Sequence, residues 1–454
     1  MLSGDCLQKK PVGGKAWCVE LARGGQRQYH GAAEGAGLRL LESARRFCLE
    51  KIMRVVGDED YTSAQMMMRR TDQARPVRSE YVEPIRKLTR EDVEDPAWRF
   101  APIAVLSLHE LGMINEMQIE RFARYFGLPL VRWRTVLAKP EELIRLDDDV
   151  DLFYDAEPGL WEYFVEGAPV LLMDNIKSTR GLVNGSPALQ DSLDFGGNPI
   201  PDALRRAYED GGYHLVTLDE PPAAVNVRVG STKTDPHFWH GVQLKDLSGR
   251  LVKMDLLRDD ESKAPQLVPL VRNVTYKSTA AVKLRSELSA NKAMPLEMRT
   301  KPFPYLLAFA ITDYKLQSRT LPRLIVNLPQ RRIPPYMKFD AWYVIFSRGT
   351  SYQSLRFLEC DEEALEKLTA LQHNEYYVAW NQGYNQTEAG GEFDQTRCEP
   401  ARRAYNEVLK RAKAAAKTAA RREAAREKRA ANKKAEAAAR KKTRARAARV
   451  SQEG

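Results

Sequence analysis

The last part of the chain sets the strongest limit on how it can fold, because it cannot contribute to a hydrophobic core. Between Leu409 and Val450 there is no large apolar side chain, and residues 401–454 hold 19 Lys and Arg against 5 Asp and Glu. Ala, Lys, Arg and Glu all favour helix, so this basic tail (residues 399–454) is predicted to be a long or fluctuating helix. It lacks the apolar stripe that a coiled coil needs. The folded core must therefore come from the preceding residues.

The charge of the chain is concentrated in the basic tail. The formal charge is +10 for the whole chain and +14 for residues 401–454, which leaves the first 400 residues at −4. A basic segment can hold phosphates without reading a sequence, with an affinity that falls steeply as salt rises. We expect a nucleic-acid clamp, and the alternative is a solvated helix that keeps the protein soluble. The run 441–446 (Lys-Lys-Thr-Arg-Ala-Arg) could also serve as a nuclear address.

Cysteine usage and hydropathy indicate the compartment. The five cysteines are scattered and form no Cys-x-x-Cys pair, which excludes a disulfide framework and favours a reducing environment. The best apolar run, residues 305–311, is far shorter than the ~20 residues that span a bilayer. The first residues lack the apolar centre of a secretory signal. We expect no membrane partner and a location in the nucleus or the cytoplasm, with the mitochondrion left open.

Apolar periodicity in the first third predicts helices followed by an α/β segment. Residues 1–36 are rich in Gly and predict a poorly ordered leader, and residues 37–160 predict a helical segment and the first part of an α/β domain. The apolar run 101–106, a helical stripe that ends at Gly127 and a second apolar run at 128–131 are typical of a β-α-β unit. We therefore expect a parallel sheet here.

The middle of the chain has a different pattern, with short strands and no long helices between them. Gly, Pro and Asn turns separate these strands, which predicts a small antiparallel β domain inserted over residues 161–300. Residues 301–385 return to the α/β pattern and complete the interrupted domain. The expected fold class is therefore α/β, a parallel-sheet domain with an inserted antiparallel β domain and a long basic C-terminal helix. The predicted strands are residues 168–173, 215–218, 225–229 and 251–256.

Several short motifs that could carry catalysis fail on their spacing. Residues 13–16 (Gly-Gly-Lys-Ala) lack both the earlier Gly of a phosphate loop and its Ser or Thr magnesium ligand. Residues 215–220 mimic an apolar strand that ends in a magnesium-binding Asp-Glu pair, but two prolines follow. The Ser-x-x-Lys pattern at 289–292 has no companion motifs. His237 and His240 have no third ligand at a suitable spacing, so no metal site is predicted.

Two segments in the last third combine apolar runs with polar groups. Residues 308–321 (Ala-Phe-Ala-Ile-Thr-Asp-Tyr-Lys-Leu-Gln-Ser-Arg-Thr-Leu) place a hydroxyl, an aromatic ring, a cation and an amide after an apolar approach. Residues 343–348 (Tyr-Val-Ile-Phe-Ser-Arg) end an apolar run with an arginine. The first segment resembles motif V of the superfamily-one DNA helicases of the PIF and RecD kind, usually Ala-x-Thr-Ile-His-Lys-Ser-Gln-Gly-x-Thr. The second resembles their motif VI, usually Tyr-Val-Ala-Leu-Ser-Arg.

Further blocks upstream resemble the same family in the family's order, and the resemblance covers about residues 38–371. One is similar to motif IV, in which an apolar helix leads to Met-Arg and acidic residues. The others resemble the stretch that ends in Ile-Asn and the family's Gly-x-Pro-Val-Met-Leu and Gly-Leu-x-Asn-Gly-Thr segments. These blocks are residues 47–54 with the acidic residues 58 and 60, residues 104–115, and residues 167–173 with 181–186.

The resemblance implies a RecA-like second motor domain that contributes to ATP hydrolysis. Arg348 and Arg54 match the arginines that stabilise charge developing on the phosphates, a task that suits the rigid guanidinium fork. Gln317 matches the position where motif V turns back towards the nucleotide, so Gln317 and Arg348 are the expected nucleotide-binding residues. ATP and Mg²⁺ are implied only if a first motor domain completes the site.

The resemblance also implies contacts with single-stranded DNA. Thr312, Tyr314 and Lys315 match positions that face the strand, where a hydroxyl and an ammonium can hold phosphates and a ring can stack on a base. Asn184, in the Gly-Leu-x-Asn-Gly-Ser block, is expected to bind DNA with them. The implied partners are single-stranded or double-stranded DNA and a chain that carries the first motor domain.

Departures from the family pattern shape the functional expectation. Tyr314 stands where the family has His, and Ser318 stands where it has Gly, which puts the tight turn beside the nucleotide in question. The phosphate loop and the magnesium-binding acidic pair have no counterpart. We therefore expect the carboxyl-terminal part of an ATP-dependent DNA helicase that is inactive by itself. The alternatives are a non-catalytic DNA- or RNA-binding protein on a helicase scaffold and a truncated gene product without a selected function.

Overall fold

The computed structural model describes a little over half of the chain. The described residues are 52–55, 57–71, 76–137, 154, 158–178, 182–229, 266–272, 280–283, 297–328, 337–374, 377–378, 381–383, 394 and 396–397. Those up to 372 belong to one compact unit, which contains the four sheets, and those from 373 belong to a second. Several predicted features lie outside the described residues, namely the leader, the basic tail, the strand at 251–256 and the motifs near residues 13, 237 and 289.

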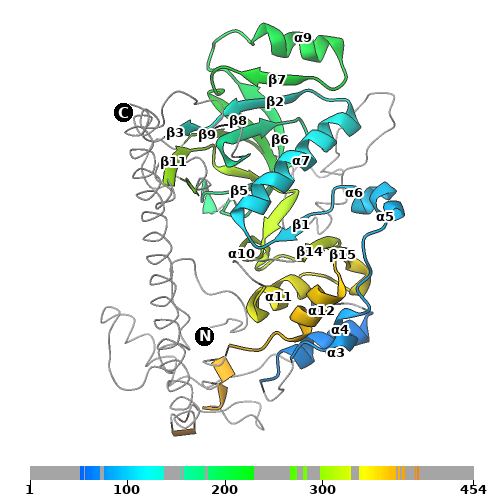
Figure 1. Cartoon of the computed structure of the whole chain (residues 1–454). Coiled ribbons are helices and arrows are strands. Elements are labelled where there is room, and N and C mark those ends of the chain that lie inside the picture. Colours follow the sequence, from blue (N-terminus) through cyan, green and yellow to red (C-terminus); the bar gives the residue numbers. More distant parts are fainter. Residues whose placement is uncertain are drawn as a thin grey trace, which may run out of the picture. The chain divides into compact units, whose positions relative to one another are not determined.

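A parallel sheet of four strands lies in the middle of Figure 1, in the order β13-β1-β14-β15. β1 (Ile103–Val105) pairs in parallel with β13 (Ala310–Thr312) and with β14 (Leu324–Asn327), and β14 pairs in parallel with β15 (Leu355–Glu359). All three residues of β1 are buried, as is typical of a parallel sheet whose two faces are covered. The predicted α/β fold class with a parallel sheet is confirmed.

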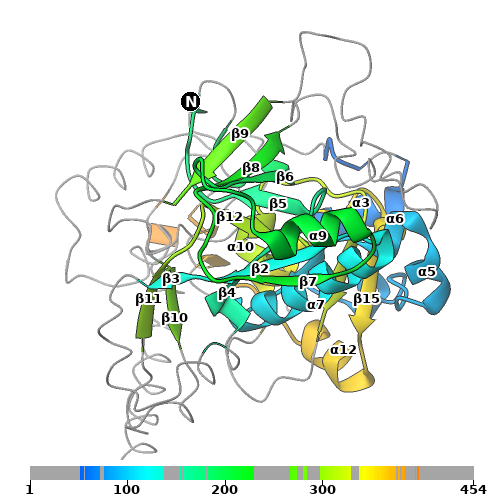
Figure 2. The ribbon, with the colours of Figure 1, turned by 90° about the horizontal axis from the view of Figure 1, so that it is seen from above.

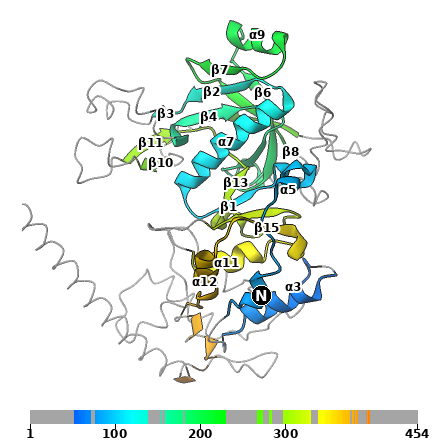
Figure 3. The ribbon, with the colours of Figure 1, turned by 45° about the vertical axis from the view of Figure 1, so that its right-hand side comes forward.

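Helices cover both faces of this sheet. α7 lies on one side, and α11 and α3 lie on the other (Figures 1 and 3). Trp342 and Phe346 of α11 are fully buried, and α10 and α11 are in contact. The helices of this part are α3 (Glu59–Met68), α4 (Ser79–Val82), α5 (Arg90–Glu94), α6 (Pro96–Arg99), α7 (Leu108–Phe126), α10 (Asp313–Leu316), α11 (Phe339–Phe346) and α12 (Glu362–Thr369).

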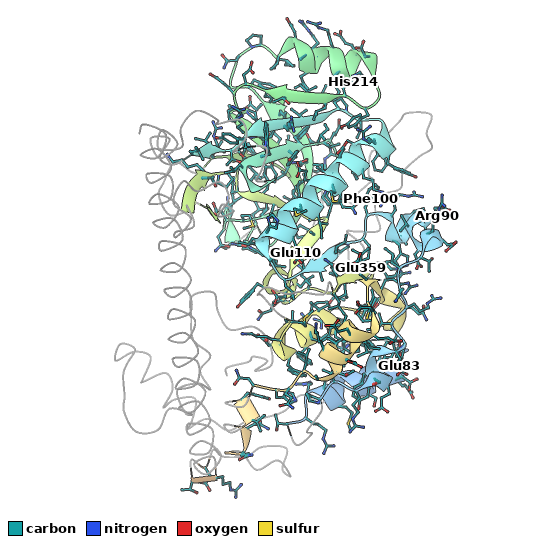
Figure 4. The ribbon with its side chains drawn as sticks, in the orientation of Figure 1. Glu83, Arg90, Phe100, Glu110, His214 and Glu359 are labelled. Atoms are coloured by element: carbon teal, nitrogen blue, oxygen red, sulfur yellow. The ribbon has the colours of Figure 1, made fainter. Side chains whose placement is uncertain are left out.

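Local capping signals define the ends of α7. Ser107 and Glu110, which is labelled in Figure 4, form a capping box at its start, because the Ser107 hydroxyl accepts from the Glu110 backbone N–H at 3.2 Å and the Glu110 carboxylate accepts from the Ser107 backbone N–H. Gly127 ends the helix with a φ of 61°, a left-handed conformation that glycine adopts without steric cost. The helix end predicted at Gly127 is thus confirmed.

The β-α-β unit predicted from residues 101–131 is wrong. β2 (Leu130–Arg134) does not join the sheet of β1 but lies in a second sheet, antiparallel to β4 (Trp161–Phe164) and parallel to β7 (Leu215–Leu218). The physical reason is that α7 spans two cores, since Leu111 packs beside β1 and Ile119 packs beside β2. Periodicity identified both strands, but it carries no information on strand partners from distant parts of the chain.

The β-rich part contains two further sheets, and the larger of them shares one core with the sheet of β2. The larger sheet is antiparallel throughout and has the order β12-β5-β6-β8-β9, and the smaller one has the order β10-β11-β3. The strands predicted at 168–173, 215–218 and 225–229 are confirmed as β5, β7 and β8 (Figure 2). The new elements are β3 (Val136–Leu137), β5 (Pro169–Leu172), β6 (Pro187–Asp194), α9 (Asp202–Asp210), β8 (Ala224–Val229), β9 (Gln266–Val271), β10 (Ala280–Lys283), β11 (Glu297–Lys301) and β12 (Tyr305–Leu307).

The described residues contain no helix that is long and apolar enough to cross a membrane. They also contain no group of three or more His, Cys, Asp or Glu side chains that could hold a metal ion.

Candidate nucleic-acid interface and arginine cluster

The predicted DNA-binding residues of the motif V segment lie where β13 ends and α10 begins. Thr312 pairs with Val105 at the carboxyl end of the parallel sheet and is the residue before the first turn of α10. Tyr314 follows with 40 % of its surface exposed, and Lys315 is half-buried. Asp313 is buried, and its carboxylate accepts a hydrogen bond from the backbone N–H of Tyr314 at 2.9 Å. The carboxyl edge of a parallel sheet is where ligands of α/β proteins usually bind.

Asn184 lies beside Lys315, although 131 residues separate them in the sequence. The Lys315 ammonium donates a hydrogen bond to Oδ1 of Asn184. Two further hydrogen bonds hold Asn184 in place. Its backbone N–H donates to Oδ1 of Asn175 at 2.8 Å, and its side-chain amide donates to the carbonyl of Met173. The structure thus brings together the two blocks that were assigned to DNA from separate motifs.

Arg319 completes this cluster and was missed by the sequence analysis. Its Nε donates to the carbonyl of Lys315 at 2.8 Å, and its Nη2 donates to the carbonyl of Gly185. Burial lowers the pKa of Arg319 to about 10. Burial also lowers the pKa of Lys315, with a further contribution from the charge of Arg319, whereas Asp174 acts in the opposite direction. No local sequence signal identifies Arg319, because its partner Gly185 lies 134 residues away along the chain.

Ser318 makes a tight turn at the position where the motif V pattern has glycine. Its φ is 68°, and among the described residues it is the one non-glycine with a positive φ. A side chain in the left-handed region costs roughly 1–2 kcal/mol. The turn that the Gly-to-Ser departure put in question is therefore present, and it directs Arg319 back towards Gly185 and Lys315.

The two arginines predicted for catalysis lie together around Ser347. Arg54 donates from Nε to the hydroxyl of Thr320 and from Nη1 to the carbonyl of Ser347, both at 2.7 Å. Arg348 donates from Nη2 to the hydroxyl of Ser347 at 2.7 Å and from Nε to the carbonyl of Val344 at 2.9 Å. The blocks that resemble motifs IV, V and VI therefore meet at one place, which we call the arginine cluster.

Arg348 is held inside the protein in this arrangement. Only 2 % of its surface is exposed, and its Nη1 contacts the carbonyl of Arg319 at 3.4 Å. Its own carbonyl accepts from the N–H of Leu321 at 2.9 Å, so the residue joins the end of α11 to the turn after α10. In this arrangement the side chain of Arg348 donates to two backbone carbonyls and to the hydroxyl of Ser347. Gln317 is half-buried at the end of α10.

Tyr61 and Asp58 fix the block that resembles motif IV against α11. The Tyr61 hydroxyl donates to the carbonyl of Phe346, and the two rings lie 4.7 Å apart. The Asp58 carboxylate caps α3 by accepting from the N–H of Tyr61 at 2.9 Å, and it accepts from the N–H of Tyr352 at 3.0 Å. Burial strongly raises the pKa of Tyr61, so its hydroxyl remains a hydrogen-bond donor at any ordinary pH.

On the other side of the sheet, Asn115 of α7 positions β13. Its side-chain oxygen accepts from the backbone N–H of Ala310 at 2.8 Å, and its own surface is 4 % exposed. The Ile-Asn ending of the block at 104–115 therefore has a structural role, because it fixes the strand that leads to Thr312.

No protein-family model and no curated protein matches the chain. Solved structures of Pif1 helicases do match. The Pif1 helicase from Candida albicans is 14% identical, with a TM-score of 0.36 over 72% of this chain and 58% of that one. Pif1 from Bacteroides with ADP-AlF3 and ssDNA is 13% identical, with a TM-score of 0.37 over 75% and 57%. Bacteroides Pif1 bound to ssDNA is 12% identical, with a TM-score of 0.37 over 76% and 57%. This chain thus spans a little over half the length of these helicases, which are of the kind that its motifs resemble.

Proposed function

We propose that this chain binds single-stranded DNA at the end of β13, through Thr312, Tyr314 and Lys315, with Asn184 and Arg319 beside them. The observation that carries the proposal is the hydrogen bond from Lys315 to Asn184, which joins two distant segments that were assigned to DNA separately. A site assembled from both segments offers a hydroxyl, an amide, two cations and a partly exposed ring at one edge of the sheet.

The charge of this site favours a phosphate ligand. In the described part of the chain, Arg319 forms no ion pair, and its hydrogen-bond acceptors there are the carbonyls of Lys315 and Gly185. The lowered pKa of both cations reflects burial without full neutralisation. A phosphate would supply the missing negative charge and accept the remaining N–H donors of Lys315. Tyr314, with 40 % of its surface exposed, can stack on a neighbouring base.

ATP hydrolysis is not proposed for the chain by itself. Arg348 is buried and engaged with the protein's own carbonyls, so its arrangement favours the second candidate function, a nucleic-acid-binding protein on a helicase scaffold. ATP-driven unwinding with Mg²⁺ would need a first motor domain, in another chain or in a longer product, to supply the phosphate loop and magnesium ligands, and it would also need Arg348 to turn outward.

We expect no DNA-stimulated ATP hydrolysis by the isolated chain. The physical reason is that arginines alone cannot position the metal and the phosphates for attack. The measurement is phosphate release with and without single-stranded DNA at saturating Mg²⁺. Clear DNA-dependent turnover that Arg54→Gln removes would contradict this expectation, because a contaminating ATPase would not respond to that substitution.

The basic tail should add a separate, sequence-blind contribution to binding. Deleting residues 401–454 removes 19 basic residues. We expect weaker DNA binding at low salt and a flatter dependence of log K on log salt concentration, because fewer counterions are released. Fluorescence anisotropy of a labelled oligonucleotide across a salt series measures both quantities. An unchanged slope would exclude the tail as a clamp.

A further inference from the structure

The outer face of the second sheet carries arginines where a surface strand usually carries mixed polar residues. In β2, Val131 and Trp133 are fully buried, so by strand alternation Arg132 and Arg134 point to the opposite face. The register places Arg134 opposite Trp161 of β4 and Arg132 opposite Thr217 of β7.

Each of these arginines is stacked on an aromatic ring. The guanidinium carbon of Arg132 lies 4.4 Å from the centroid of the Trp161 ring, and that of Arg134 lies 4.7 Å from the centroid of the Tyr154 ring. Nε of Arg132 also donates to the hydroxyl of Thr217 at 3.1 Å. A ring on one side and a hydroxyl at one edge hold the guanidinium plane in a fixed orientation.

The same arrangement continues onto α7. The guanidinium carbon of Arg124 lies 4.0 Å from the centroid of the Tyr213 ring, just before β7 begins, and Glu120 holds Arg124 through an ion pair of 2.7 Å. Figure 2 shows α7, β2 and β7 side by side, and α7 contacts β2. These pairs form a surface that we call the arginine–aromatic surface, made of Arg124, Arg132, Arg134, Tyr154, Trp161 and Tyr213.

Arg132 differs from the arginines that form ion pairs on the surface. Among the described residues, no carboxylate forms an ion pair with Arg132, whereas Arg90 pairs with Glu94 and Arg205 pairs with Asp202. The Arg132 side chain is partly exposed, and its Nε is used by the hydroxyl of Thr217, so its charge is not neutralised by a carboxylate in the described part of the chain. Such a group can accept a stacked base on its face and a phosphate at its edge.

We propose that the arginine–aromatic surface is a second contact for single-stranded nucleic acid, with bases stacked on its planar groups and a phosphate bound at the edge of Arg132. The proposal rests on the proposed function for the class of ligand, but not on the site at the end of β13. A nucleic-acid base suits this surface better than an acidic peptide does. A carboxylate binds only the edge of a guanidinium, whereas a base can also stack on its planar face.

The test compares two double variants of the full chain that each remove two positive charges. Arg132→Gln with Arg134→Gln removes the two guanidinium groups of β2. Arg90→Gln with Arg205→Gln is the control, and Arg90 lies on α5, away from β2 (Figure 4). With an oligothymidylate of about 20 nucleotides in about 0.1 M salt, the first variant should bind roughly tenfold more weakly, and its salt slope should fall by about one to two. The control should stay within about twofold.

A spectroscopic readout reports the stacking directly. Saturating oligothymidylate should quench part of the tryptophan emission of the wild-type chain. This quenching should disappear in Trp161→Phe. It should be weaker in Arg132→Lys, which keeps the positive charge but loses the planar guanidinium. Arg132→Lys also covers the case in which the double variant does not fold.

Three outcomes would overturn the proposal. The first is equal affinity of the two double variants, and the second is quenching that Trp161→Phe leaves unchanged. The third is that poly-L-glutamate binds the wild-type chain as tightly as the oligonucleotide does, and that Arg132→Gln with Arg134→Gln weakens both interactions equally. This result would indicate an acidic protein partner. If Lys315→Gln weakens binding while Arg132→Gln with Arg134→Gln does not, only the second contact fails. If the wild-type chain does not bind the oligonucleotide at all, the proposed function itself is contradicted.

Discussion

Replacing Lys315 by Gln should weaken the binding of single-stranded DNA about tenfold, and replacing Arg319 by Gln should weaken it at least as much. A charge-assisted hydrogen bond contributes about 1.5–3 kcal/mol, and about 1.4 kcal/mol corresponds to a tenfold change in affinity. Lys315 donates to Asn184, and Arg319 holds the carbonyls of Lys315 and Gly185, so the second change also loosens the first residue. Equilibrium titration by anisotropy in about 0.1 M salt measures the effect.

The matched control for this prediction is Lys367→Gln. Lys367 lies on α12, is exposed and pairs with Glu363, so its replacement removes the same charge from a surface with no role in the proposed site. Lys315→Gln should lower the salt slope by about one relative to wild type, as expected for one lost phosphate contact. Equal affinities of the Lys315 and Lys367 variants would show that position 315 contributes only through net charge.

Replacing Arg348 by Ala should destabilise the protein by about 3 kcal/mol or more. The substitution removes a side chain that is 2 % exposed, takes the Arg348 donor from the carbonyl of Arg319, and leaves the carbonyl of Val344 with the Ser347 hydroxyl as its remaining side-chain donor. The measurement is the urea concentration at the midpoint of unfolding, followed by circular dichroism. The structural reason is that the side chain of Arg348 joins the end of α11 to the carbonyl of Arg319 in the turn after α10.

Arg86→Ala is the control for the stability experiment. Arg86 is exposed and donates to the side chain of Gln353, so its removal should change the free energy of unfolding by less than about 0.5 kcal/mol. A guanidinium held in reserve for a nucleotide would make few internal contacts. If Arg348→Ala unfolds at the same urea concentration as wild type, Arg348 is not the internal link that its contacts indicate.

The sequence was most informative where a signal is local. The end of α7 at Gly127 and the positions of the strands at 168–173, 215–218 and 225–229 depend on neighbouring residues, and the structure has them where the patterns indicated. The β-α-β unit failed for a physical reason, since β1 pairs with strands about 200 residues further along the chain and β2 pairs with β4 and β7. Backbone pairing across such distances leaves no periodic trace.

The candidate site was predicted in part. The resemblance identified Lys315 and Asn184, and their hydrogen bond joins them in the structure. It gave no indication of Arg319, because its importance comes from burial against the 183–186 turn. The inward orientation of Arg348 was also unpredictable, since a motif specifies a residue type and not the rotamer that surrounding carbonyls select. Ser318 adopts the turn of a glycine next to Arg319, which is anchored by its hydrogen bonds to the carbonyls of Lys315 and Gly185.

Photocrosslinking tests the central claim most directly, that single-stranded DNA binds where β13 ends. An oligonucleotide that carries a photoreactive thymine analogue is bound to the full chain and irradiated, and the crosslinked peptides are identified by mass spectrometry. We predict a crosslink within residues 308–321, centred on the exposed ring of Tyr314, that weakens in Lys315→Gln but not in Lys367→Gln. Crosslinks found elsewhere in the chain, with none in residues 308–321, would contradict the account.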